Sequence, residues 1–133
     1  MAGGESAMNI AFACVLMAGL LPFVCAVAAK WGFREFDNHN PRQWLARQTG
    51  FRARANAAQS NSFEAFPLFA VGVVLATLVH ADSLRVDACA LVFVGARVGF
   101  IACYLADRAS LRSLFWLLGL LSSLGLYAAA LAY

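Results

Sequence analysis

The chain has 133 residues, of which 62% are hydrophobic and 13% are charged, and its mean hydropathy is +0.72. This composition excludes an ordinary soluble domain, in which roughly half of the residues are apolar and a quarter are charged. The net charge of +3 is small, and most basic residues run directly into an apolar segment, which argues against nucleic-acid binding. The composition therefore predicts a polytopic membrane protein.

The first apolar run covers residues 9–29 and predicts a transmembrane helix. A signal peptide is the competing interpretation. The run exceeds the apolar region of a signal peptide in length, and no Lys or Arg precedes it. We therefore expect a retained helix, kinked at Pro22, because proline removes one helical hydrogen bond.

The segment that follows, residues 30–50, is a polar and basic loop. Residues 38–41 (Asn-His-Asn-Pro) indicate a turn, and His39 is interpreted as a solvated turn residue. Trp31 is expected to anchor the end of the first helix at the membrane interface. Six of the ten Lys and Arg residues lie between the first two apolar runs, which places this loop in the cytoplasm by the positive-inside rule. The six are Lys30, Arg34, Arg42, Arg47, Arg52 and Arg54.

The second helix is predicted over residues 52–80, and it carries polar side chains into the membrane. Arg54, Asn61 and Glu64 are spaced by seven and three residues, so they project from one helix face. No charged residue follows Glu64 until after Val79. A carboxylate at such a depth costs about 2.5 kcal/mol or more unless it is paired or neutral. Glu64 is therefore a functional-site candidate, beside a helix bend expected at Pro67.

The third and fourth helices are predicted over residues 88–106 and 113–133, with short connections before and between them. Short connections make consecutive helices antiparallel neighbours. The sequence thus predicts a single all-α domain, an up-down bundle of four transmembrane helices. Both termini are expected outside and both basic loops in the cytoplasm, with the protein in the inner or cell membrane.

The third helix contains a second charge at membrane depth, Arg97, with Phe100 and Tyr104 on the same face. Arg97 and Glu64 both fall roughly 15 Å below the cytoplasmic boundary at 1.5 Å per residue. We therefore predict that they form a buried ion pair, which would explain both charges without any catalysis.

Two further features have structural interpretations. Gly95 and Gly99 match the small-residue pattern of close helix contacts. The four cysteines lie in apolar runs without a Cys-x-x-Cys pair or clustered histidines, so no metal site is expected.

The run over residues 59–69 (Gln-Ser-Asn-Ser-Phe-Glu-Ala-Phe-Pro-Leu-Phe) resembles the second-helix signature of the MAPEG family, the membrane-associated proteins of eicosanoid and glutathione metabolism. Residues 104–113 resemble the junction of helices three and four in the prostaglandin E synthase branch of that family. The resemblance covers nearly the whole chain and is that of a bacterial-type member. It implies a homotrimer with a glutathione site between subunits, open to the cytoplasm.

The same resemblance implies roles for individual residues. Arg112 would polarise the glutathione thiol as the catalytic residue. The family's arginine seven residues before the helix-two glutamate is Ala57 here, and Arg54 is the nearest basic group. The residues expected to hold glutathione are Lys30, Arg54, Gln59, Asn61, Glu64, Arg97, Tyr104, Arg108 and Ser113.

Two functions of different class remain open on the sequence. One is a glutathione-dependent transferase or peroxidase that acts on lipophilic electrophiles dissolved among the membrane lipids. The other is a non-catalytic membrane scaffold that keeps the fold but not the glutathione chemistry.

Overall fold

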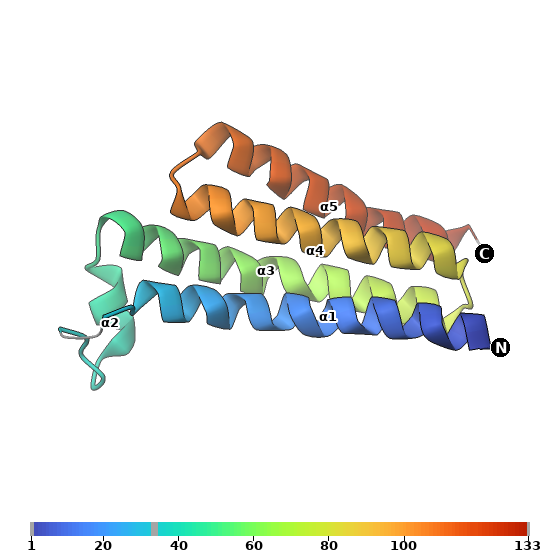
Figure 1. Ribbon diagram of the computed structural model, residues 1–133, viewed down its shortest axis with the longest axis horizontal. Helices are drawn as coiled ribbons and strands as arrows, with labels where there is room; N and C mark the ends of the chain where they lie inside the picture. The colour runs from blue at the N-terminus through green and yellow to red at the C-terminus, as the bar shows by residue number, and fades with distance from the viewer. Residues whose placement is uncertain (1, 33–34, 133) are drawn as a thin grey trace.

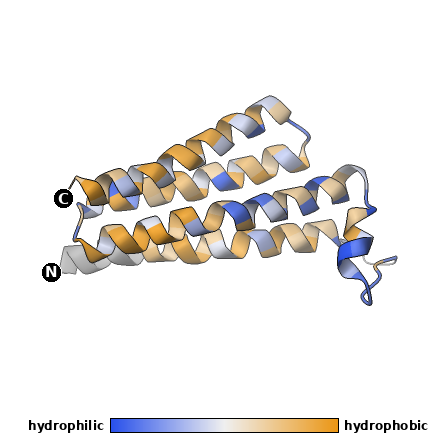
Figure 2. Cartoon of the chain, turned by 180° about the vertical axis from the view of Figure 1, so that it is seen from behind, coloured by the Kyte–Doolittle hydropathy of each residue, from blue (hydrophilic) through white to orange (hydrophobic). Residues whose placement is uncertain are grey.

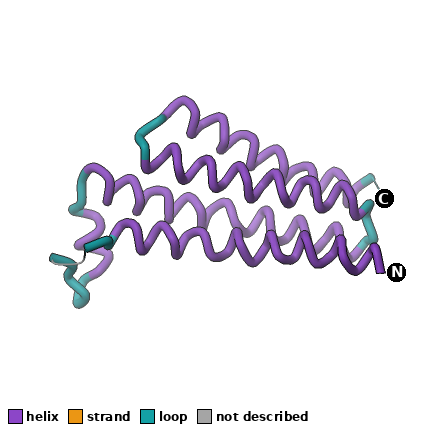
Figure 3. The backbone as a smooth tube through the Cα atoms, viewed as in Figure 1, coloured by secondary structure: helices purple, strands orange, loops and turns teal. Residues whose placement is uncertain are grey.

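The protein, described here from a computed structural model covering residues 2–32 and 35–132, contains four long helices and one short one (Figure 1). Arg34 and Tyr133 lie outside the described residues. The long helices are α1 (Ala2–Ala29), α3 (Gly50–Leu78), α4 (Ser83–Leu105) and α5 (Ala109–Leu131), and the short helix is α2 (Pro41–Ala46). All described secondary structure is helical, which confirms the predicted fold class (Figure 3).

Each long helix contains a stretch that is long and apolar enough to cross a bilayer. In α1 this stretch is Ile10–Ala29, and the other three helices qualify over their whole lengths. At 1.5 Å per residue, about 20 residues cross a hydrocarbon core of roughly 30 Å. The hydropathy colouring in Figure 2 shows the same pattern, with apolar helices and a polar α2 region. The chain is therefore a multi-pass integral membrane protein.

The long helices alternate in direction, and both termini lie at one end of the bundle (Figure 1). The α1–α3 and α4–α5 connections lie together at the opposite end, which we call the loop end. Helix α4 packs against each of the other three long helices. Helix α5 diverges from the bundle toward the loop end, so the space between α3 and α5 widens in that direction.

The core consists of two apolar clusters separated by a polar level. The larger cluster lies toward the termini and includes Phe69 and Phe93, whose rings stack with centroids 3.9 Å apart. The smaller cluster lies toward the loop end and contains Cys25, Ala58, Phe100 and Ile101. Between them along the chain come buried Ser62 on α3 and buried Arg97 on α4. The candidate site is built at this level.

Small side chains allow the helices to approach one another. A methyl group added at Gly99 would meet the Phe115 ring at 2.7 Å, so this glycine permits close α4–α5 packing. The same addition at Gly95 meets nothing within 4 Å. The predicted packing role is therefore confirmed for Gly99, whereas Gly95 faces away from the described part of the chain.

The helix boundaries differ from the predicted ones at several points. Helix α4 begins at Ser83 and not near residue 88, and α5 begins at Ala109 and not at residue 113. The polar residues at both starts lie in first helical turns, where charged side chains still reach water. Helices α1 and α3 continue through Pro22 and Pro67.

Candidate functional site

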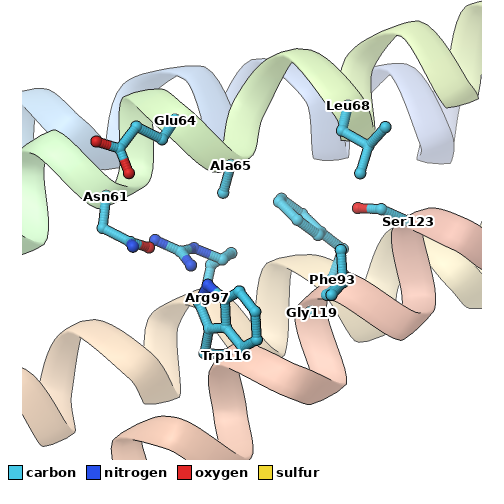
Figure 4. A pocket seen from close by; sticks show the side chains of 10 residues that line it. Asn61, Glu64, Ala65, Leu68, Phe93, Arg97, Trp116, Gly119 and Ser123 are labelled. Carbon is cyan, nitrogen blue, oxygen red and sulfur yellow. The ribbon is translucent and has the colours of Figure 1, made fainter.

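A cavity of about 220 Å³ lies between α3, α4 and α5 at the polar level. We call it the membrane cavity. Helix α3 contributes Asn61 and Glu64, α4 contributes Arg97, and α5 contributes Trp116 and Ser123 (Figure 4). The remaining lining residues are Ala65, Leu68, Phe93, Gly119 and Leu120. Polar and charged side chains of α3 and α4 thus face an aromatic ring and small side chains of α5.

Arg97 is held in place by two contacts. Its side chain is 3% exposed, and Nη2 donates a hydrogen bond to Ser62 Oγ over 3.2 Å. The guanidinium carbon lies 4.2 Å from the centroid of the Phe100 ring, in a cation–π contact. A guanidinium has five N–H donors, so most remain free for a ligand in the cavity.

The predicted ion pair between Glu64 and Arg97 is wrong. Both residues line the membrane cavity, so the expected common depth is correct, but no ion pair joins Arg97 to any described carboxylate. Ser62 accepts the hydrogen bond instead because it faces α4 from the same turn of α3. Glu64 is exposed in the single chain although it is the central residue of α3.

Asn61 adds an unused acceptor to this cavity. Its Oδ1 atom is buried and has no hydrogen-bond partner. In Figure 4 its amide and the Arg97 guanidinium point toward one another across the cavity. A buried acceptor without a donor costs about 1 to 3 kcal/mol, so Asn61 is poised for a donor from outside the chain.

A series of four side chains connects the membrane cavity to the loop end, and we call it the cation–aromatic ladder. Arg97 lies over Phe100, Phe100 meets Tyr104 edge to face at 5.5 Å, and Arg112 lies 4.4 Å from the Tyr104 ring centroid. The spacing of three and four residues on α4 predicted that Arg97, Phe100 and Tyr104 share one helix face, and the first two contacts agree with this. The ladder places one guanidinium at membrane depth and a second near the surface.

Arg54 forms hydrogen bonds that join two helices of the bundle. Its Nε and Nη2 atoms donate to the backbone oxygen of Leu105 at 3.3 and 3.2 Å. This carbonyl belongs to the last turn of α4, where helical partners are lacking. Arg54 therefore ties α3 to the end of α4 beside Tyr104, and part of its donor capacity is used by the protein.

The other predicted site residues lie outside the membrane cavity. Lys30 is over the Phe36 ring at 4.9 Å, in the α1–α2 connection. Gln59 is half-buried on α3. Ser113 donates to the Ala109 backbone oxygen at 3.2 Å. Arg108 is exposed at the N-cap of α5. None of these four residues lines the membrane cavity, so the structure does not bring them together with Arg97 there.

Sequence reasoning missed four buried polar residues of the interior: Ser62, Asp87, Ser122 and Ser123. Ser62 holds Arg97, and Ser123 lines the membrane cavity from α5. Asp87, one residue before the predicted start of the third helix, is buried in α4, and its Oδ1 has no hydrogen-bond partner. The available signal was the spacing of Ser62 from Ala55 and Ala58, seven and four residues before it, because residues at this spacing share one helix face.

The fold and the cavity define a class of protein, an integral membrane helical bundle with a polar site at membrane depth. The model of the MAPEG family matches residues 10–132. The chain therefore belongs to the MAPEG family. Comparison of its sequence with curated proteins gives no match.

Proposed function

We propose that the protein is a glutathione-dependent transferase or peroxidase acting on lipophilic electrophiles. The observation that carries the proposal is the cation–aromatic ladder, which ends in the membrane cavity at Arg97 and at the surface in Arg112. Family membership supports it, because the ladder contains three of the residues that the resemblance assigns to the peptide and its thiol: Arg97, Tyr104 and Arg112.

The residues present fit a small peptide that carries two carboxylates and one ammonium group. The guanidinium groups of Arg97 at membrane depth and Arg54 nearer the loop end suit two separated carboxylates, since charge-assisted hydrogen bonds are about twice as strong as neutral ones. The exposed carboxylate of Glu64 suits an ammonium group. The buried Oδ1 of Asn61 needs a donor, which a peptide N–H supplies. Glutathione has this set of groups.

Arg112 is the proposed thiol-activating residue. Its side chain makes a cation–π contact with Tyr104 and no hydrogen bond to any other described residue, so all of its donors are free. When bound, glutathione supplies a thiol as the nucleophile. A guanidinium beside that thiol favours its ionised form, because the negative charge is then paired. Tyr104 positions Arg112 through its ring.

The α5 wall of the membrane cavity suits the lipophilic substrate. Trp116 and Leu120 present apolar surface next to the polar groups of α3 and α4, and Trp116 is 44% exposed toward the membrane. An electrophile dissolved in the bilayer would reach the thiol laterally, without crossing the aqueous phase.

We further propose that the active form is a homotrimer. The membrane cavity, at about 220 Å³, is below the roughly 300 Å³ at the lower end of small-molecule sites, so one chain forms only part of a site. Glu64 is exposed at the centre of α3, where contact with lipid would cost about 2.5 kcal/mol or more. A second copy packed on this face would complete the site and cover the carboxylate. The loop end would face the cytoplasm.

The alternative, a scaffold without glutathione chemistry, is favoured by Ala57 and by the use of Arg54 at the end of α4. Calorimetry with reduced glutathione separates the two. We expect binding by the wild type and weaker binding by Arg112→Gln. Arg85→Gln, which removes an exposed cation at the opposite end of the bundle, is the control and should bind like the wild type. Equal binding by wild type and Arg112→Gln would contradict the proposed role of Arg112, and no binding by the wild type would favour the scaffold.

A further inference from the structure

A second and larger hollow lies at the loop end, where α1 stops and α3 starts. Its volume is about 620 Å³, and we call it the loop cavity. Its lining residues are Ala28, Trp31, Gln48, Thr49, Phe51 and Arg52. None of them carries a carboxylate. The cavity is of the size of small-molecule sites, roughly 300 to 1,000 Å³, and shares no lining residue with the membrane cavity.

The rim of the loop cavity is aromatic and exposed. Trp31 is 71% exposed and Phe51 is 45% exposed. Trp31 comes two residues after the end of the first membrane span, at Ala29, and Phe51 is the second residue of α3. Both rings therefore lie at the level where aromatic side chains contact the boundary between acyl chains and headgroups.

The wall of the loop cavity is positively charged. Arg52 donates hydrogen bonds from Nη1 to Ala29 O and from Nη2 to Trp31 O, and it lies 5.6 Å from the Trp44 ring centroid. These bonds fix the guanidinium at the end of α1 and use two of its five donors. The others are available to an anion that enters the cavity.

Two more exposed cations belong to the same α1–α3 connection and have no acidic partner among the described residues. Arg42 lies in α2 and Arg47 directly precedes the lining residue Gln48, and both are exposed. Among the described residues, neither forms an ion pair with a carboxylate. The described acidic residues of the α1–α3 connection are Glu35 and Asp37, and Asp37 accepts the backbone N–H of His39.

From these observations we infer that the loop cavity binds the headgroup of an anionic phospholipid from the adjoining leaflet. The phosphate and the added negative charge meet Arg52, with Arg42 and Arg47 contributing at longer range. The acyl chains pass over Trp31 and Phe51. A soluble anion would use the cations but not the exposed aromatic rim. Basic clusters next to a membrane span are typical of recognition of anionic lipid.

Fluorescence of Trp31 tests this inference directly. In the Trp44→Phe/Trp116→Phe background Trp31 is the one remaining tryptophan, because the chain has three. The protein is reconstituted in bilayers that contain brominated phosphatidylglycerol or brominated phosphatidylcholine at equal mole fraction. The two lipids share the phosphate and differ in net charge, so preferential quenching by phosphatidylglycerol reports anionic selectivity.

We expect that preference in the starting protein and a decrease of about 25-fold in Arg42→Gln/Arg47→Gln, since each cation near a membrane surface is worth about fivefold. Arg85→Gln, which removes an exposed cation at the opposite end of the bundle, is the matched control and should keep the preference. If the double variant does not insert, a salt titration of the starting protein replaces it. The Debye length falls from about 10 Å at 0.1 M to about 3 Å at 1 M, so the preference should decrease.

Three results would overturn the inference. Equal quenching by the two lipids would indicate ordinary boundary lipid. Absence of quenching by either lipid would indicate that a second copy or another protein covers the cavity. A preference that is insensitive to both salt and the arginine substitutions would remove the role of these cations.

Discussion

The substitution Arg97→Met tests whether Arg97 serves ligand binding or the stability of the bundle. The substitution keeps a long side chain at a position that is 3% exposed, but it removes the charge and the donors. The wild-type guanidinium is buried in the bundle with a hydroxyl and an aromatic ring as partners and no described carboxylate. Burial of this guanidinium in the membrane therefore costs free energy. This cost can be compared with the free energy that its two contacts contribute.

The contributions nearly offset each other. Loss of the hydrogen bond from Arg97 to Ser62 costs about 1.5 to 3 kcal/mol, as for bonds to charged groups. Loss of the contact with Phe100 costs about 2 kcal/mol, the value for a desolvated cation–π pair. Against these, an arginine at the centre of a membrane helix costs about 2.5 to 3.5 kcal/mol on insertion scales. The apolar contacts of methionine add to stability. We therefore expect a change of no more than about 1 to 2 kcal/mol.

The assay is thermal unfolding in detergent together with glutathione calorimetry. Arg97→Met should unfold within a few degrees of the wild type and should no longer bind glutathione. Ser62→Ala should weaken binding less, because the guanidinium charge remains, and should have little effect when added to Arg97→Met. A stability loss well above 2 kcal/mol with glutathione binding intact would refute this reasoning and identify Arg97 as a structural residue.

Three further predictions concern packing, assembly and orientation. Gly99→Ala should lower stability by about 1 to 2 kcal/mol, because the new methyl group would lie 2.7 Å from Phe115 and overpacking outweighs the helix propensity of alanine. Gly95→Ala has open space and should be neutral or slightly stabilising in thermal unfolding, so an equal loss would contradict the assigned contact. Native mass spectrometry from mild detergent should give a trimer, and a dominant monomer would argue against a shared site. A reporter that fluoresces only in the cytoplasm, fused to the C-terminus, should give no fluorescence. Fluorescence would contradict the proposed orientation.

The number of membrane helices and their alternating directions could be predicted, because they depend on long apolar runs and short connections. The cation–aromatic ladder on α4 was also accessible, since Arg97, Phe100 and Tyr104 follow helical spacing. Its last member, Arg112, comes from α5 and was placed near Tyr104 only by resemblance. Contacts within one helix follow from the period of that helix, whereas contacts between helices do not.

The partner of Arg97 was not predictable for this reason. Ser62 and Glu64 are two residues apart on α3 and point in different directions, so the choice depends on the rotation of α3 against α4. A charge-based argument favoured the carboxylate, but the geometry favours the hydroxyl. Asp87 was misplaced because neighbouring polar residues suggested a connection, although α4 already begins at Ser83.

The short helix α2 illustrates a signal that was present and not used. Pro41 occupies the first turn of α2, a position that proline favours because its missing N–H has no helical partner there. The role of Arg54 had no such signal. Its two hydrogen bonds to Leu105 depend on the end of α4 reaching the start of α3, which only the folded bundle defines.

The most direct test of the proposed function is calorimetry of the purified protein with reduced glutathione, in parallel with the S-methyl derivative. We expect binding of both peptides, with the free thiol bound more tightly in the wild type, because only the thiol can ionise beside Arg112. This difference should disappear in Arg112→Gln. Absence of binding heat with both peptides, in protein that is folded and assembled, would contradict the proposal of a glutathione site.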